Sequence, residues 1–137
     1  MIIVYTTGVF DLLHPGHLDT LKRARALGDR LVVGVQDDES VLGQKGRLPS
    51  VNCTNRMLML EAFSFVDVVI PYYNIDQREM LALIKPDIMV QGQDWLLTGD
   101  RRDIVEYLRQ NGIRLVQFPD IKNLSSTKIK KHIKQSG

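Results

Sequence analysis

The sequence is short of the features that mark several classes of protein. It has one cysteine, Cys53, among 137 residues, so neither an intrachain disulfide framework nor a cysteine-cluster zinc site is expected. Its 18 lysines and arginines nearly balance its 16 aspartates and glutamates, which argues against a nucleic-acid coat. The first run, MIIVYTT, lacks the charged region and cleavage site of a signal peptide, and no apolar run reaches the length of a membrane span. These absences predict a cytoplasmic protein with no membrane or nucleic-acid partner.

What the sequence does contain is an alternation of short apolar runs and amphipathic segments. The apolar runs are mostly continuous and rich in β-branched residues, as in strands buried on both faces; they are residues 2–5, 31–35, 66–70, 88–90 and 113–118. Segments with helical periodicity lie between or after them, at 17–27, 55–65, 76–84, 101–110 and 125–135. The alternation predicts an α/β fold, a single Rossmann-like domain over residues 1–137 with about five parallel strands and helices on both faces.

Polar loops follow several of the predicted strands. The longest are residues 36–52, 92–101 and 119–127, and the stretch TTGVFDLLHPGH, residues 6–17, follows the first strand. In an open parallel sheet, ligands bind beyond the carboxyl ends of the strands, where the strand order reverses. We therefore expect these four segments to gather at one edge of the sheet.

Two of the three histidines stand in the first of these segments. A helix is predicted to begin near Pro15, because proline suits the first helical turn. His14 and His17 then flank a helix N-terminus, where free N–H groups and the helix dipole favour an anion. Gly16 removes a side chain that would keep a phosphate from the backbone, and the imidazoles can donate hydrogen bonds to a phosphate that gains negative charge. Two alternatives stay open: simple helix caps, or a zinc pair completed by Asp11.

These residues resemble a known signature. His14-Pro15-Gly16-His17, preceded by Gly8-Val9-Phe10-Asp11, is similar to the His-x-Gly-His motif of a nucleotidyltransferase superfamily, in its cytidylyltransferase-like branch. The resemblance extends along nearly the whole chain, through LKRARALGDRLVVGV, NRMLMLEAFSFVD, KPDIMVQGQDW and LSSTKIKK. It implies that an acceptor phosphate attacks the α-phosphate of a nucleoside triphosphate in line, that pyrophosphate leaves, and that Mg²⁺ accompanies the triphosphate. Members of this superfamily are often dimers, so a homodimer is expected.

The resemblance also implies roles for individual residues. The catalytic residues would be His14, His17 and Lys45. The nucleotide-binding residues would be Thr7, Gly8, Val9, Phe10, Gly16, Arg56, Gln91, Gly92, Ser125, Ser126 and Thr127. The second substrate would be bound by Asp11, Lys45, Arg47, Asp94 and Trp95. No metal ligand is expected from the protein itself.

Several of these residues have a second interpretation. Lys45 and Arg47 could be solvated loop charges instead of phosphate ligands. Arg56 lies near the start of its helix, where a cation is unfavourable, and either a phosphate or a salt bridge to an acid would explain it. Trp95 could be a lid, a stacking face or a packing residue. The hydroxyls of residues 125–127 could cap the last helix without binding phosphate.

The substrates are left open by the sequence. Glycerol-3-phosphate cytidylyltransferases are similar in GVFDLLH-GH, in Asp94-Trp95 and in STKIK, but residues 120–123 (DIKN) depart from their Arg-Thr-Glu-Gly run, which puts CTP in doubt. Heptose-1-phosphate adenylyltransferase domains are similar in residues 45–52, in NRM and in SST. The nucleotide is therefore CTP or ATP, and the acceptor a small sugar or polyol phosphate. A non-catalytic nucleotide-binding module, and a metal-dependent hydrolase using His14, His17 and Asp11, are the alternative functions.

Overall fold

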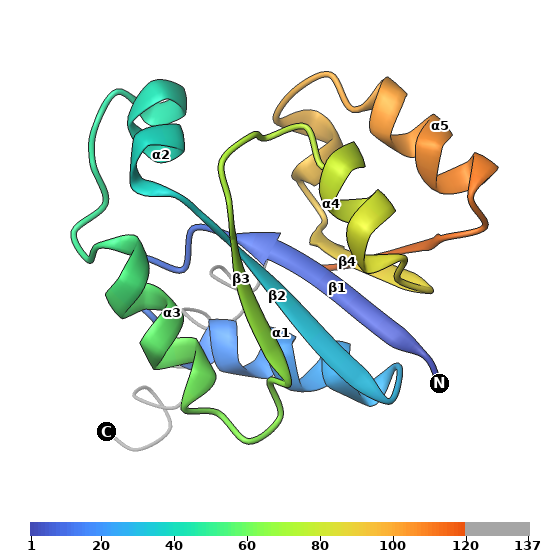
Figure 1. Cartoon of the computed structure of the whole chain (residues 1–137), viewed down its shortest axis with the longest axis horizontal. Coiled ribbons are helices and arrows are strands. Elements are labelled where there is room, and N and C mark those ends of the chain that lie inside the picture. The colour runs from blue at the N-terminus through green and yellow to red at the C-terminus, as the bar shows by residue number, and fades with distance from the viewer. Residues whose placement is uncertain (120–137) are drawn as a thin grey trace, which may run out of the picture.

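Five strands form one parallel sheet in the order β3-β2-β1-β4-β5 in the computed structural model, which describes residues 1–119 (Figure 1). The strands are β1 (Ile3–Gly8), β2 (Arg30–Gln36), β3 (Val68–Tyr72), β4 (Ile88–Gly92) and β5 (Arg114–Phe118). The order reverses between β1 and β4, which are hydrogen-bonded neighbours at the centre of the sheet. The predictions for the helix at 125–135 and for Ser125, Ser126 and Thr127 lie outside the described residues.

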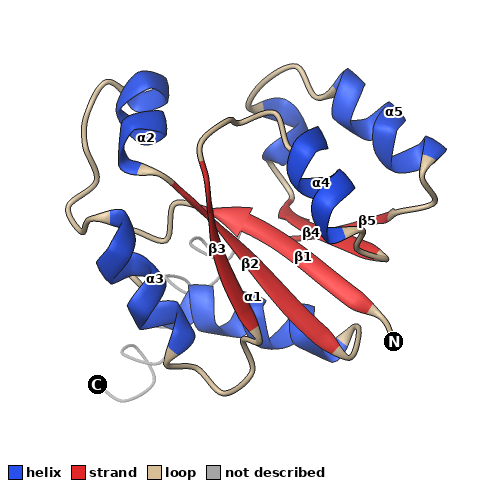
Figure 2. Cartoon of the chain, viewed as in Figure 1, coloured by secondary structure: helices blue, strands red, loops and turns tan. Residues whose placement is uncertain are grey.

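Helices cover both faces of this sheet (Figure 2). Within residues 1–119 the helices are α1 (Pro15–Ala26), α2 (Asp38–Lys45), α3 (Cys53–Glu61), α4 (Arg78–Ile84) and α5 (Arg102–Gln110), and η1 (Trp95–Leu97) is a 3₁₀ turn. Those on the faces are α1 and α3 on one side and α4 and α5 on the other. The α1–α3 side and the α4–α5 side each bury a separate apolar cluster against the sheet. The predicted α/β Rossmann-like fold is therefore confirmed. Within residues 1–119, no helix is long and apolar enough to cross a membrane.

Neighbouring residues of one strand belong to different clusters. Val4 packs in the cluster that contains Leu21 of α1, whereas Tyr5 packs in the one that contains Leu81 of α4. Both strand residues are fully buried. A strand buried on both faces needs apolar side chains at successive positions, which explains the continuous apolar runs of the sequence.

The prediction that residues 36–52 form a loop is wrong in one part, because they contain α2. The helix starts where the Asp37 side chain accepts a hydrogen bond from the Glu39 N–H, and it ends at Gly46 with a φ of 75°. An aspartate N-cap and a left-handed glycine C-cap are ordinary helix boundaries. Apart from η1 in the predicted loop at 92–101, the other helices and strands within residues 1–119 are as predicted, with boundaries shifted by at most four residues; β3, for example, is Val68–Tyr72, where 66–70 was expected. Figure 1 places α2 beyond the carboxyl end of β2.

Candidate phosphate-transfer site

The two histidines cap the N-terminus of α1 reciprocally. The Gly16 N–H donates to His14 Nδ1 at 3.0 Å, and the His14 N–H donates to His17 Nδ1 at 3.3 Å. The ring centroids lie 4.0 Å apart. The helix-cap interpretation of these residues is thus correct for Nδ1, and the cap does not involve the Nε2 atom of either ring.

The capping fixes the protonation pattern of the rings. A nitrogen that accepts a hydrogen bond carries no proton, so the hydrogen of each neutral imidazole resides on Nε2. Nε2 is the end of the ring away from the backbone, and both histidines are half-buried and line a cavity. The β1–α1 junction therefore holds two imidazoles, each fixed through Nδ1, at a helix N-terminus, which suits an anion.

The segment between β1 and the histidines has an unusual backbone. Phe10 adopts a φ of 53°, a region that side-chain-bearing residues rarely occupy. Its ring lies edge-on to the His17 ring at 5.9 Å between centroids. A Cβ on Gly8 would lie 2.9 Å from the Phe10 ring, so only glycine leaves room for it. Backbone strain of this kind is often found at binding sites, and here it brings an aromatic ring against a histidine.

The histidines line an open cavity of about 710 Å³ at the carboxyl edge of the sheet. One wall comes from the β1–α1 junction and the other from α2 and the segment after it. Seven sequence-predicted site residues line it together: Val9, Phe10, Asp11, His14, His17, Lys45 and Arg47. Lys45 ends α2 and Arg47 follows it, and both side chains are exposed. Two cations thus face two imidazole donors across a cavity of a size suited to a small phosphorylated ligand.

Asp11 is used inside this site, not as a partner of the histidines. Its carboxylate accepts hydrogen bonds from the Ser50 N–H at 2.9 Å and the Val51 N–H at 2.8 Å. The Ser50 bond is the main cause that holds the pKa of Asp11 below its ordinary value. Asp11 therefore ties the β1–α1 junction to the segment before α3. Within residues 1–119 no group of three or more His, Cys, Asp or Glu side chains is placed to hold a metal ion, so the zinc alternative has no ligand set there.

Arg56 forms the salt bridge that the sequence left as an alternative. Its Nη2 lies 2.7 Å from Asp38 Oδ1, and the arginine side chain is fully buried. Its Nε donates to the Val51 carbonyl at 2.8 Å, and its Nη1 donates to the carbonyls of Val9 at 2.7 Å and Gln36 at 2.8 Å. Arg56 does not line the cavity. The unfavourable cation at a helix start is therefore explained by an acid and three carbonyls.

The remaining predicted residues within 1–119 do not line the cavity. The Gln91 side chain donates to the Thr7 hydroxyl at 2.8 Å, which joins β4 to β1 where the strand order reverses. Trp95 packs against the α4–α5 cluster, and the Arg101 guanidinium lies 5.0 Å from its ring centroid. Its packing interpretation is the one realised here. Gly92 and Asp94 are exposed nearby, and a nucleotide contact by these residues stays a prediction.

Sequence reasoning missed five of the residues that line the cavity and the partner of Arg56. The missed lining residues are Leu12, Val41, Leu48, Pro49 and Ser50, and the missed partner is Asp38. Acidic residues at 37–39 followed by Lys45-Gly46 form a helix start and stop pattern. That pattern was the available signal for α2, and with it for Asp38 and Val41.

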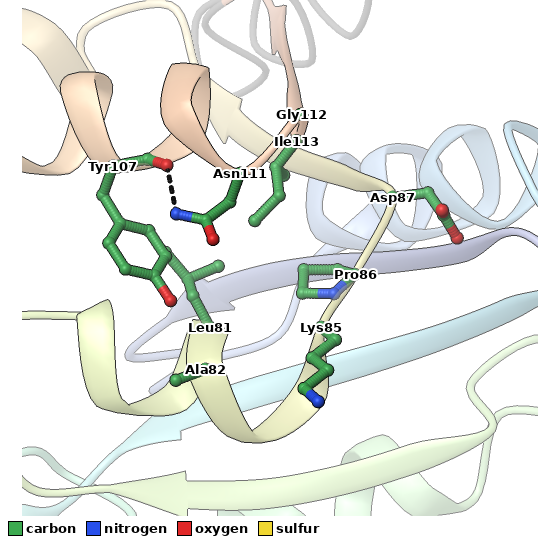
Figure 3. A pocket seen from close by; sticks show the side chains of 9 residues that line it. All are labelled: Leu81, Ala82, Lys85, Pro86, Asp87, Tyr107, Asn111, Gly112 and Ile113. Atoms are coloured by element: carbon green, nitrogen blue, oxygen red, sulfur yellow. Dashed lines mark hydrogen bonds between the residues drawn. The ribbon is translucent and has the colours of Figure 1, made fainter.

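A second cavity, of about 360 Å³, lies at the opposite edge of the sheet, between the C-terminal ends of α4 and α5 (Figure 3). Pro86 and Asp87 precede β4, and Ile113 precedes β5. The Tyr107 ring points toward Leu81 in this view. Because ligands of open parallel sheets bind at the carboxyl ends of the strands, this cavity is not the expected place for the chemistry.

The fold and the histidine junction define a class, an α/β Rossmann-like fold with a capped pair of histidines after its first strand. The profile of the family described as "Cytidylyltransferase-like" matches residues 5–132. The chain belongs to this cytidylyltransferase-like family of HxGH nucleotidyltransferases.

Relatives of known name agree with the family. "Bifunctional protein HldE" of Helicobacter hepaticus is 37% identical over 95% of this chain, and its namesake in Haemophilus influenzae is 44% identical over 68%. The chain spans only 28% and 20% of these relatives. The crystal structure of a "lipopolysaccharide core biosynthesis protein" from Thermoplasma volcanium matches with a TM-score of 0.73 and 32% identity, covering 87% of this chain and 95% of that one. A pantoate-beta-alanine ligase from Francisella tularensis, 14% identical with a TM-score of 0.56 over 86% of this chain and 59% of that one, shares the fold alone.

Proposed function

We propose that this chain transfers a nucleotidyl group from a nucleoside triphosphate to the phosphate of a small sugar phosphate and releases pyrophosphate. The observation that carries the proposal is the reciprocal histidine cap, which fixes both imidazoles through Nδ1 beside a cavity that Lys45 and Arg47 also line. A module that only binds nucleotide needs phosphate ligands, but it has no use for donors held where charge develops.

The donors act in the transition state. As the acceptor oxygen attacks, negative charge grows on the α-phosphate oxygens, and hydrogen bonds from His14 and His17 strengthen with it. The donors are held by the helix backbone, so little reorganisation is needed at that moment. The acceptor is already a phosphate anion, so no general base is required to create the nucleophile.

The cations of the second wall position the substrates. Lys45 and Arg47 are exposed side chains that can approach the phosphates of the triphosphate or the phosphate of the acceptor. Arginine offers a planar pair of donors to a phosphate and lysine a point charge. Asp11 does not contact phosphate in this scheme, since its carboxylate would repel the anion and is already bound to two backbone N–H groups.

We infer that Mg²⁺ arrives with the triphosphate instead of residing on the protein. The described residues lack a ready set of metal-ligating side chains, and Mg²⁺ is commonly held by substrate phosphates and water with few protein ligands. When bound, the ion neutralises charge on the triphosphate and the leaving pyrophosphate.

Adenylyl transfer is the form of the reaction we favour. The HldE relatives and the resemblance of residues 45–52 to heptose-1-phosphate adenylyltransferase domains point to ATP and a sugar 1-phosphate. The departure of residues 120–123 from the glycerol-3-phosphate cytidylyltransferase pattern argues in the same direction. The proposed dimer and cytoplasmic location stay expectations.

The test is a panel of ATP, CTP, GTP and UTP against heptose-1-phosphate, glycerol-3-phosphate and other sugar phosphates, with pyrophosphate release as the readout. Release that requires both ATP and a sugar phosphate is expected. Release that requires only the triphosphate would indicate hydrolysis, and tight nucleotide binding without release for any pair would indicate a binding module.

A further inference from the structure

The two walls of the 710 Å³ cavity are joined behind it by a closed set of hydrogen bonds. Asp11 accepts from the Val51 N–H, and Arg56 donates to the carbonyl of the same residue. The same guanidinium donates to the carbonyl of Val9, two residues before Asp11. Both backbone polar groups of Val51 are therefore hydrogen-bonded. Its N–H is bound by Asp11, and its carbonyl is bound by the arginine that also binds Val9, so both bonds connect it to the segment that follows β1.

Arg56 is the centre of this set. Its fully buried guanidinium reaches acceptors in four separate parts of the chain, which are the β1–α1 junction, the end of β2, the start of α2 and the segment before α3. Asp38 also accepts from the Cys53 N–H with its other oxygen, at 3.2 Å. Four hydrogen bonds employ four of the five guanidinium hydrogens. The guanidinium of Arg56 is therefore poorly placed to bind a phosphate in the cavity, because it is buried and most of its donors already bind protein atoms.

We propose that Arg56 is a positioning residue for the transfer reaction: it sets the distance between the histidine wall and the wall that carries Lys45 and Arg47. The inference rests on the proposed function for its kinetic part and on the contacts alone for its structural part. Phosphate transfer depends on placing both reactants within fractions of an ångström, and a rigid buried fork is suited to that.

A matched control exists at the other edge of the sheet. Arg25 lies 3.1 Å from Asp67 and donates to the Gly28 carbonyl at 2.7 Å, so it also joins separate segments through an ion pair and a carbonyl. It lines none of the described cavities. Lysine in place of either arginine keeps the charge and loses the planar fork.

The kinetic experiment compares Arg56→Lys with Arg25→Lys. For Arg56→Lys we expect kcat/KM for the sugar phosphate to fall roughly 10–100-fold, mainly through KM, because the histidine cap does not involve Arg56. For Arg25→Lys we expect values within about twofold of the original. Equal losses in the two variants would mean a general effect on stability and would overturn the inference.

The second readout needs no activity. Trypsin cuts after lysine and arginine, and the bond after Arg47 lies in the exposed segment that Arg56 and Asp11 hold. We expect Arg56→Lys to speed native-state cleavage there roughly tenfold or more, through easier local opening, and Arg25→Lys to leave it unchanged. An unchanged cleavage rate with a raised KM would indicate a direct phosphate contact by Arg56 and would overturn the inference.

A further variant covers the case in which Arg56→Lys does not fold. Asp38→Asn leaves Arg56 in place and removes its charged partner, whose side chain is 32% exposed. Cleavage after Arg47 is expected to rise several-fold, and cleavage and KM both at their original values would again overturn the inference. If the unmodified chain releases no pyrophosphate with any substrate pair, the proposed function fails, while the cleavage rates still decide whether Arg56 positions the wall.

Discussion

The N-termini of α1 and α3 both carry basic side chains next to the cavity, but the hydrogen bonds of these side chains differ. At α1, two imidazoles cap the helix through one nitrogen each and line the cavity. At α3, Arg56 is buried and its donors are bound to protein acceptors. Both helices begin next to the same cavity, but of these three side chains only the two histidines line it.

The difference lies in how many donors the protein itself uses. A neutral imidazole has one donor and one acceptor, and a cap through Nδ1 uses only the acceptor. A guanidinium has five donors and no acceptor, so its burial is tolerated only when nearly all of them are paired. Chemistry at the α1 start and rigidity at the α3 start follow from this count.

The largest expected effect on stability comes from removing the Arg56 side chain near the start of α3. Arg56→Ala should lower the free energy of unfolding by about 3–5 kcal/mol, because it leaves Asp38 and three carbonyls without their partner in a poorly solvated place. Urea unfolding followed by circular dichroism measures it. Arg25→Ala is the control, and its half-exposed pair should cost about 1 kcal/mol or less. Equal losses of unfolding free energy in the two variants would show that Arg56 stabilises the fold no more than Arg25 does.

The next effect separates the two roles of the α1 histidines. Asparagine is among the best helix N-caps, so His14→Asn should leave the unfolding free energy within about 1 kcal/mol of the original while it removes the Nε2 donor. Turnover should fall roughly 10²–10³-fold, the usual scale for losing one such donor. His17→Ala should lose turnover on the same scale and should also lose the hydrogen bond from the His14 N–H, which is one half of the reciprocal cap.

Pyrophosphate release and urea unfolding are the paired measurements for these variants. Near-normal turnover in either histidine variant would sink the transfer mechanism. A loss of turnover matched by a collapse of stability in His14→Asn would mean that the histidines serve only the helix.

The same two helix N-termini differ in how much of their structure the sequence predicts. Pro15 and Gly16 between the histidines were enough to predict the helix N-terminus found there, because capping is a local effect. The phosphate site at the same place stays a prediction. The anomaly of a cation near the start of the next predicted helix was also visible at Arg56. Its resolution was not, since Asp38 is 18 positions away and the carbonyl of Val9 is 47 away.

Helix α2 and the other lining residues of the second wall were not predicted for a similar reason. Residues 36–52 are polar and contain glycine, and the amphipathic pattern of so short a helix as α2 is weak. Only the sequence of acids followed by Lys45-Gly46 marked its two ends. Lining residues such as Leu48 and Ser50 carry no chemistry of their own, and only the tertiary structure brings them opposite the histidines.

A smaller effect probes the exposed cations. Arg47→Ala should raise the KM of a phosphate substrate roughly tenfold, the scale of one charged hydrogen bond, and leave the unfolding free energy unchanged because the side chain is exposed. Arg102→Ala is the matched control, since that exposed arginine pairs with Asp100 away from the cavity. Steady-state kinetics at two salt concentrations measure both. The same change in both variants would reduce Arg47 to a solvated loop charge.

The smallest effect concerns pH and the hold on Val51. The pKa of Asp11 lies below its ordinary value because the folded carboxylate accepts N–H bonds, that of Ser50 first. The stability that Asp11 adds is therefore complete above the ordinary aspartate pKa of about 3.9 and is lost as the pH falls through the lowered, folded value. The difference in unfolding free energy between the original chain and Asp11→Asn should stay constant from pH 5 to pH 8, at roughly the scale of one hydrogen bond, and shrink only in stronger acid. Urea unfolding at several pH values measures it. A difference that already changed near pH 7 would mean that Asp11 is coupled to a histidine after all, and the separation of the two helix starts would then be weaker than the contacts indicate.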